Sequence, residues 1–217
     1  MDIENARFNM IEQQIRPWEV LDPEVLRVCS EVQRENFVPD AFRSLAFSDT
    51  EIDLGHDQKM MAPKVEARAL QALQIRHSDR ILEIGTGSGY VTALLGTLGA
   101  HVTSIEIFES LAEQASKNLR ASNLQNIKLH VGDGLDGWKT AEPYDVILVT
   151  GSCPNRRDSV EQQLCPGGRL FMVVGSGAIM EAVLVTRIDR DTWVEESLFE
   201  TRLAPLVGAE LAPKFRF

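Results

Sequence analysis

The sequence predicts a doubly wound α/β fold, in which a mostly parallel sheet of about seven strands follows an N-terminal helical extension. Three observations lead to this prediction. From residue 80 onward, short apolar runs alternate with amphipathic segments, as expected of repeated βα units. A glycine-rich turn at residues 85–89 directly follows the first apolar run. A short polar turn separates the last two runs, which predicts a hairpin whose last strand is antiparallel.

The first third of the chain is predicted to be helical. Apolar residues recur three or four positions apart, the spacing that places them on one helix face. Asp22 followed by Pro23 is typical of a helix start, because aspartate caps the first amides and proline tolerates the first helical position. A long polar segment rich in Asp, Gly and Pro interrupts this pattern, and such segments are often functional. We expect helices over residues 5–15, 23–32, 41–45 and 65–73, and a loop over residues 48–63.

Strands and helices alternate in the remainder of the chain. The run over 144–150 is almost continuously apolar, which is typical of a strand covered on both faces. We expect strands over residues 80–84, 101–106, 127–131, 144–150, 169–174, 181–188 and 192–199, helices over 89–98, 108–122 and 157–164, and a turn over 166–168. This pattern divides the chain into a helical cap with the polar loop, residues 1–78, and a sheet core, residues 79–217, which we expect to form one compact unit.

The composition argues against several classes of function. The 217 residues are 44% hydrophobic, enough to build the core of one α/β domain. A formal net charge of −10 argues against a nucleic-acid partner. No apolar stretch approaches the roughly 20 residues that cross a bilayer, and the first residues do not resemble a signal peptide. The 3 cysteines are widely spaced and argue for a reducing compartment, so we expect a cytoplasmic protein with no membrane partner.

The most specific signal is the run RILEIGTGSGY at residues 80–90. A strand, a glycine turn and a helix in this order bring bare backbone close to a nucleotide-like ligand. Tyr90 stands where a dinucleotide site needs a small residue. Glu83 precedes the turn, and an anion there suits a cationic amino-acid cofactor better than a diphosphate. The motif therefore favours S-adenosylmethionine over NAD, with contacts from Glu83, Gly85, Thr86, Gly87, Ser88 and Gly89.

Polar residues also stand at the ends of three other predicted strands, where the ligand of an open α/β sheet binds. A carboxylate at Glu106 can accept hydrogen bonds from a ribose diol. Asp133 lies between two glycines and either accepts from an adenine amino group or forms an Asx turn. Thr150 either lies beside the reacting centre or forms a turn. The candidate cofactor contacts at these ends are Glu106, Ile107, Asp133, Gly134 and Thr150.

With these residues assigned, the chain resembles the protein-L-isoaspartate O-methyltransferase family over nearly its whole length. The cofactor motif over 82–90 matches closely. The N-terminal half, which generic methyltransferases do not share, makes the resemblance specific. Matching segments are residues 20–26, 32–39, 46–49, 54–58, 132–134 and 166–170.

The resemblance implies a Rossmann-like core that binds S-adenosylmethionine. It also implies transfer of the methyl group to the α-carboxylate of an L-isoaspartyl residue in a damaged protein. The resulting ester collapses to a succinimide, which begins repair. Because a carboxylate is already nucleophilic, we expect catalysis to come mostly from positioning and from the exclusion of water.

The chain departs from the family pattern in the active-site segment. Where the family reads Gln-Thr-Ile-Ser, this chain reads Gln58-Lys59-Met60-Met61, so two hydroxyls that the resemblance places near the acceptor carboxylate are absent. Met61 cannot donate a hydrogen bond, whereas Lys59 either offers a cation to a carboxylate or points to solvent. We therefore take Lys59 and Met61 as the candidate catalytic positions. Val207 is a further departure, because many members carry threonine there.

Three functional hypotheses follow from these residues. The first is a carboxyl methyltransferase that acts on isoaspartyl sites. The second keeps the cofactor but changes the acceptor to a small molecule or another protein carboxylate, because Lys59 and Met61 replace the two hydroxyls. The third is a non-catalytic binding module, which the intact Glu83, Glu106 and Asp133 argue against. An NAD-dependent enzyme is a remote fourth, and no metal site is expected because the histidines lack a paired metal spacing.

Overall fold

The computed structural model of the protein describes residues 2–140 and 143–209. Residues 141–142 and 210–217 of the predicted core segment 79–217 lie outside the described residues. A seven-stranded sheet in the order β5-β4-β3-β6-β7-β8-β9 forms the centre of the molecule. Its strands are β3 (Arg80–Ile84), β4 (His101–Glu106), β5 (Ile127–Val131), β6 (Tyr144–Cys153), β7 (Leu164–Val174), β8 (Met180–Arg187) and β9 (Trp193–Thr201).

The direction of the strands confirms the predicted fold class. Strands β3 to β7 pair in parallel, whereas β8 is antiparallel to both β7 and β9. The chain builds outward from β3 to β5 and then returns to add β6 on the other side of β3. The strand order therefore reverses between β3 and β6, which is the position where open α/β sheets bind ligands.

The central strands β3 and β6 are buried on both faces, and their successive residues point to opposite sides. Ile81 and Phe171 belong to the larger hydrophobic core, which also takes in the N-terminal helices. Their neighbours Leu82 and Leu170 belong to the second core on the opposite face. Residues of the predicted cap and of the sheet thus share one core.

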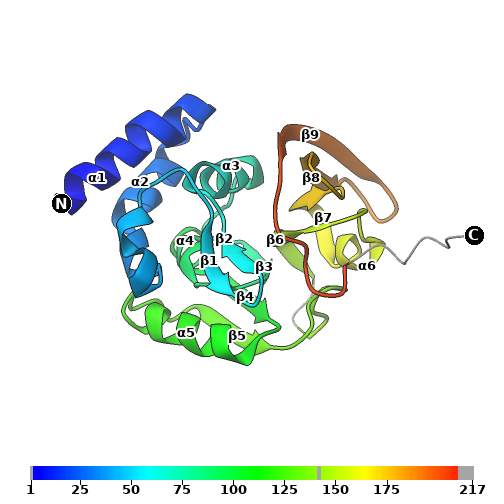
Figure 1. Cartoon of the computed structure of the whole chain (residues 1–217). Helices are drawn as coiled ribbons and strands as arrows, with labels where there is room; N and C mark the ends of the chain where they lie inside the picture. Colours follow the sequence, from blue (N-terminus) through cyan, green and yellow to red (C-terminus); the bar gives the residue numbers. More distant parts are fainter. Residues whose placement is uncertain (1, 141–142, 210–217) are drawn as a thin grey trace, which may run out of the picture.

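The helices α1 and α2 lie at one end of the molecule, and the strands β7 to β9 lie at the other (Figure 1). Asp22 caps α2 as predicted, because its carboxylate accepts from the backbone N–H groups of Glu24 at 2.8 Å and Val25 at 3.3 Å. The α-helices are α1 (Ile3–Met10), α2 (Pro23–Glu31), α3 (Pro63–Leu73), α4 (Tyr90–Leu98), α5 (Glu109–Arg120) and α6 (Asp158–Glu161). A π-helical turn over Ile11–Ile15 and 3-10 turns over Arg16–Trp18, Arg34–Asn36 and Asp40–Leu45 complete the helical elements.

The loop predicted over 48–63 is wrong, because this segment contains an antiparallel hairpin of β1 (Ile52–Gly55) and β2 (Gln58–Met60). Its turn is tight, since Gly55, His56 and Asp57 all have positive φ angles, of 87°, 56° and 57°. The polar composition concealed the hairpin, although Ile52 and Met60 are buried on one side. In Figure 1 the hairpin lies in front of the sheet, between α3 and α5.

Two smaller differences concern the region after β6. The helix predicted over 157–164 is limited to α6, because the chain enters β7 already at Leu164. The predicted turn at 166–168 is an irregularity within β7, where the register shifts between Tyr144↔Leu164 and Val146↔Arg169. Gly167 allows this excursion with a φ of 81°. Within residues 2–140 and 143–209, no helix has the length and apolarity that a bilayer crossing requires.

Candidate functional site

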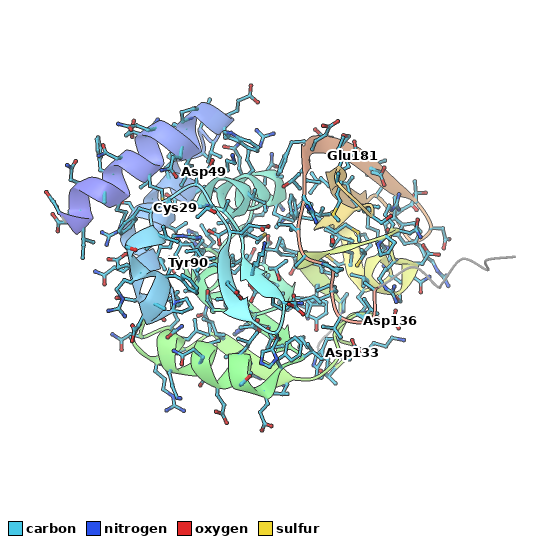
Figure 2. The ribbon with its side chains drawn as sticks, viewed as in Figure 1. Cys29, Asp49, Tyr90, Asp133, Asp136 and Glu181 are labelled. Atoms are coloured by element: carbon cyan, nitrogen blue, oxygen red, sulfur yellow. The ribbon has the colours of Figure 1, made fainter. Side chains whose placement is uncertain are left out.

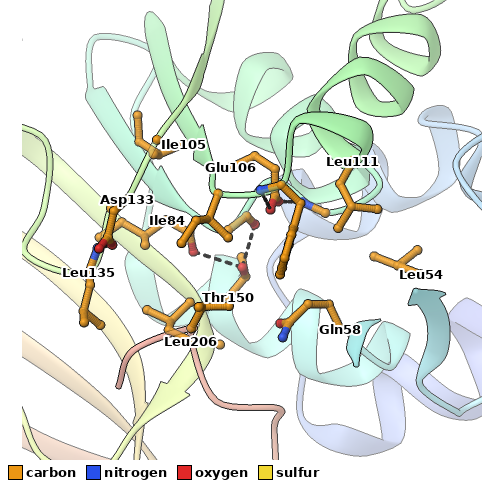
Figure 3. A pocket seen from close by; sticks show the side chains of 18 of the residues that line it. Leu54, Gln58, Ile84, Ile105, Glu106, Leu111, Asp133, Leu135, Thr150 and Leu206 are labelled. Atoms are coloured by element: carbon orange, nitrogen blue, oxygen red, sulfur yellow. Dashed lines mark hydrogen bonds between the residues drawn. The ribbon is translucent and has the colours of Figure 1, made fainter. Parts of the chain in front are cut away.

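A pocket lies at the reversal of strand order, beyond the carboxyl ends of β3, β4 and β6 (Figure 3). Apolar side chains, among them Ile84, Ile105 and Leu206, form much of its wall. The predicted contact residues that line the pocket are Gly85, Gly87, Glu106, Ile107, Asp133, Gly134 and Thr150, together with Lys59. Sheet topology thus gathers at one edge residues that are far apart in sequence.

Glu106 is held in a fixed orientation at the end of β4. One carboxylate oxygen accepts from the backbone N–H of Gly87 at 2.8 Å, and the other accepts from that of Phe108 at 3.0 Å. The side chain is largely buried but still forms part of the pocket wall. Each carboxylate oxygen has more than one acceptor site, so both can accept a further hydrogen bond from a ligand.

The glycine turn fits closely against β6. Thr150 Oγ1 lies 3.0 Å from the carbonyl oxygen of Ile84 and 2.6 Å from that of Gly85, and it donates its proton to this pair. A Cβ atom on Gly85 would lie only 2.2 Å from the same hydroxyl. Gly85 has a φ of 97°, and Gly87 and Gly89 also have positive φ angles, so the backbone conformation favours glycine at all three positions.

Asp133 follows β5 at the far side of the pocket. Its Oδ1 atom accepts from the backbone N–H of Leu135 at 2.8 Å, which is an Asx turn. Figure 3 places Asp133 beside Leu135, and the residue is exposed. The neighbouring Gly134 is closely packed, because an added Cβ would lie 3.1 Å from Ile84 Cγ2. Asp133 therefore keeps a free carboxylate oxygen beside a closely packed turn.

Glu83 is fully buried and does not belong to the pocket wall. One carboxylate oxygen accepts from the hydroxyls of Ser104 and Thr92, while Oε1 has no hydrogen-bond partner within the described residues. Burial raises the pKa of Glu83 to about 8, against the effect of these two hydrogen bonds. The Ser104 hydroxyl also lies 2.6 Å from that of Thr86 in the turn. The Ser104 hydroxyl thus links Glu83 to the glycine turn by hydrogen bonds.

A side chamber adjoins the pocket and shares Leu54, Lys59, Gly85, Gly87 and Thr150 with it. The chamber itself is lined by Met60, Met61, Glu66, Thr86, Ser88 and Val91. Met61 is only 4% exposed. The side chain of Lys59 is 52% exposed and forms an ion pair with Glu51 at 3.2 Å. The two candidate catalytic positions therefore have very different surroundings.

Sequence reasoning missed the buried pair of Arg34 and Glu66. Arg34 donates to the Glu66 carboxylate, to the carbonyl oxygen of Met61 at 2.8 Å and to that of Ala46 at 3.0 Å. The pair thus holds the backbone of the active-site segment in place. The available signal was spacing, because Glu66 stands four and seven positions before Leu70 and Leu73 on the apolar face of α3.

The hairpin of β1 and β2 reaches over the pocket entrance. His56 stacks on Phe108 with ring centroids 4.2 Å apart and an interplanar angle of 14°. Its Nε2 atom also lies 2.9 Å from the hydroxyl of Ser110 in α5. Leu54, from the same hairpin, forms part of the pocket wall (Figure 3). The hairpin therefore connects the active-site segment to the far side of the pocket.

An open groove of about 600 Å³ lies on the other side of Lys59. Lys59, Arg202, Glu51 and Asp57 contribute charged groups to it. Arg202 is exposed and makes no ion pair with any described residue. Lys59 lines both this groove and the pocket, so it stands at their junction.

The residues of the pocket and chamber fit S-adenosylmethionine. Glu106 and Asp133 offer carboxylate oxygens for hydroxyl and amino groups, and the apolar walls suit an adenine ring. Glu66 lines the chamber, and its Oε1 atom, which has no hydrogen-bond partner among the described residues, offers an acceptor to a cationic group. In the described part of the chain, no group of His, Cys, Asp or Glu side chains is placed to hold a metal ion.

Comparison with known proteins agrees with the fold. Residues 5–211 match the family model described as protein-L-isoaspartate(D-aspartate) O-methyltransferase. The chain is 39% identical over 202 residues to a protein-L-isoaspartate O-methyltransferase of Rhodopseudomonas palustris, covering 93% of both chains. It is 38% identical over 207 residues to one of Syntrophus aciditrophicus, covering 94% of this chain and 95% of the other.

Two solved structures share the fold. A protein-L-isoaspartate O-methyltransferase gives a TM-score of 0.81 at 24% identity, covering 95% of this chain and 66% of that chain. A putative member from Plasmodium falciparum, in complex with S-adenosyl-L-homocysteine, gives 0.77 at 17% identity, covering 95% and 98%. The sequence matches and the fold together show that this chain belongs to the protein-L-isoaspartate O-methyltransferase family of S-adenosylmethionine-dependent methyltransferases.

Proposed function

We propose that this protein methylates the α-carboxylate of L-isoaspartyl residues in damaged proteins, with S-adenosylmethionine as the methyl donor. Family membership over nearly the whole chain supports the reaction. The observation that carries the proposal for this site is the position of Lys59, which lines both the pocket and the open groove. A cofactor in the pocket and a protein carboxylate in the groove would meet beside Lys59. We expect the enzyme to act in the cytoplasm.

Bound S-adenosylmethionine supplies an electrophilic methyl group on a sulfonium centre. In our proposal, Glu106 accepts hydrogen bonds from the ribose hydroxyls, and its bonds to Gly87 and Phe108 keep it oriented. Asp133 accepts from the adenine amino group with the oxygen that its Asx turn leaves free. The remaining proposed contacts line the pocket or the chamber and are Gly85, Thr86, Gly87, Ser88, Ile107, Gly134 and Thr150. Gly89, the last predicted contact of the turn, lines neither cavity. Glu83 supports the turn through the hydroxyl of Ser104.

The groove supplies what a carboxylate acceptor needs. Lys59 and Arg202 are cations at its edge, and a carboxylate between them would be oriented by charge. No general base is required, because the attacking carboxylate oxygen already carries the electron pair. The hairpin of β1 and β2 would limit the access of water to the reacting centre. Positioning is therefore the main contribution that we assign to this chain.

A second candidate keeps the reaction and changes the acceptor. Lys59 and Met61 stand where the family carries two hydroxyls, and the Met61 side chain cannot donate a hydrogen bond to an isoaspartyl carboxylate. This observation favours an acceptor that is another protein carboxylate or a small molecule.

A methyl-transfer assay with matched peptides tests the proposal. We expect labelled methyl groups to enter an L-isoaspartyl peptide as a base-labile ester and to leave its aspartyl twin unlabelled. Label on a different acceptor in cell extract, with the isoaspartyl peptide untouched, would select the second candidate. If none of the acceptors leads to the formation of S-adenosyl-L-homocysteine, the chain is a non-catalytic binding module and not a methyltransferase.

A further inference from the structure

Glu66 is a buried acid with an unsatisfied oxygen beside the glycine turn. The residue is 2% exposed, and Oε2 accepts from Arg34. The Oε1 atom has no hydrogen-bond partner within the described residues. Glu66 nonetheless lines the side chamber, together with Gly85 and Ser88. An acceptor left unpaired in such a place costs free energy unless a ligand supplies a donor.

The chamber continues the cofactor pocket in the direction that the cofactor must take. In the proposed function, the adenosyl part contacts Glu106 and Asp133 at the far side of the pocket. The amino-acid part must then extend past Gly85 and Gly87, which the pocket and the chamber share. The chamber is therefore where the α-ammonium and α-carboxylate groups of the cofactor would lie.

We propose that Oε1 of Glu66 binds the α-ammonium group of the amino-acid part of S-adenosylmethionine. The inference rests on the proposed function for the identity of the cofactor. It replaces the direct role that the sequence suggested for Glu83, because Glu83 lies outside the walls of both cavities whereas Glu66 lines one of them. An ammonium group is the donor that an anionic, desolvated acceptor binds most strongly.

The charges around Glu66 are compatible with this role. Burial raises the pKa of Glu66 to about 7, and the opposing effect of Arg34 is smaller. An ammonium ligand favours the ionised carboxylate, so its binding near pH 7 releases a proton. The titratable or charged groups that face Glu66 are Cys29 of α2, Arg34, Lys59 of β2, Glu83 of β3 and Tyr90 of α4. Figure 2 labels Cys29 and Tyr90, which lie where α2 and α4 meet.

Calorimetry with two matched ligands tests the inference without an activity measurement. The ligands are S-adenosyl-L-homocysteine and its desamino analogue, in which hydrogen replaces the α-ammonium group. We expect Glu66→Gln to weaken binding of the first by about tenfold or more, the range for a hydrogen bond to a charged group. Binding of the desamino analogue should change by less than about twofold. Glu113→Gln, at an exposed position of α5, serves as the matched control.

Glu66→Gln also disturbs the pair with Arg34, so the wild-type protein provides a second measurement. Binding heats in buffers of different ionisation enthalpy give the number of protons released. We expect release near pH 7 with S-adenosyl-L-homocysteine and less with the desamino analogue. Equal proton release on binding of the two ligands would overturn the inference. An equal loss of affinity for the two ligands in Glu66→Gln would overturn it as well. Failure of the wild-type protein to bind S-adenosyl-L-homocysteine would instead overturn the proposed function, and the inference with it.

Discussion

Gly85 and Thr150 are in such close contact that one excludes a side chain on the other. The Thr150 hydroxyl donates to the carbonyl oxygen of Gly85 at 2.6 Å, and a Cβ atom at Gly85 would lie 2.2 Å from that hydroxyl. This contact joins β6 to the end of β3 at the reversal of strand order. The turn that borders the pocket is therefore fixed by packing as well as by backbone conformation.

Gly85→Ala should consequently destabilise the protein by roughly 2–5 kcal/mol, the sum of a positive-φ penalty and an overpacking penalty. Gly167 is the matched control, because it also has a positive φ, of 81°, but has no atom within 4 Å of an added Cβ. Gly167→Ala should cost only about 1–2 kcal/mol. Urea unfolding measures both values, and equal losses would show that the contact with Thr150 has no energetic effect.

Glu106→Ala should weaken the binding of S-adenosyl-L-homocysteine by roughly 1.5–3 kcal/mol, which is about 10-fold to 150-fold. The variant loses the carboxylate that accepts hydrogen bonds from the ribose hydroxyls in our proposal. Gly87 and Phe108 already orient this carboxylate before the ligand binds. Calorimetry gives the affinity. Glu113→Ala, on the exposed side of α5, should leave it unchanged. Equal affinity of the Glu106 variant and the wild type would show that the ribose does not bind at Glu106.

The sequence predicted the parallel core and most of the pocket because both depend on local patterns. Buried parallel strands are visible as apolar runs, and the glycine turn is specified by residues that are adjacent in the chain. Glu106 and Asp133 were predicted for the same reason, since each stands at the end of a recognisable strand. Parallel strands then bring their carboxyl ends together whatever their separation in sequence.

The remaining features depend on contacts between distant segments. The hairpin of β1 and β2 is short and polar, and its tip contacts Phe108 and Ser110 through His56. No local pattern specifies this contact. Arg34 and Glu66 come from separate elements, and both are charged residues that composition would place at the surface. Only the helical spacing of Glu66 indicated that it faces the interior.

The buried carboxylate of Glu83 should make stability fall as the pH rises. Burial raises its pKa from 4.5 to about 8 in the folded protein. Between these two values the folded state binds a proton that the unfolded state has lost, so stability decreases with increasing pH. From pH 6 to pH 8, the wild type should therefore lose roughly 1–3 kcal/mol more than Glu83→Gln, which does not titrate.

Denaturant unfolding at several pH values between about 6 and 8 measures this difference, with each variant compared with itself across the series. Glu113→Gln is the control, because an exposed carboxylate in α5 should give the same pH profile as the wild type. Parallel profiles for the wild type and Glu83→Gln would show that Glu83 stays ionised in the folded protein.

His56 should control how quickly the cofactor leaves. Its ring stacks on Phe108 and forms a hydrogen bond with the hydroxyl of Ser110. The hairpin of β1 and β2, to which His56 belongs, also places Leu54 in the pocket wall. His56→Ala removes both contacts, which are worth about 1–2 kcal/mol in total, so the hairpin should open more often. We expect dissociation of S-adenosyl-L-homocysteine in stopped-flow experiments to accelerate by roughly 5-fold to 30-fold.

The association rate separates this explanation from a loss of pocket structure. An opened hairpin leaves the pocket intact, so association should be unchanged or faster, whereas a damaged pocket would slow it. His101 provides the control, because it is exposed at the start of β4, at the edge of the sheet opposite the pocket. His101→Ala should leave both rates unchanged. If His56→Ala behaves in the same way, the hairpin is not a barrier to cofactor release.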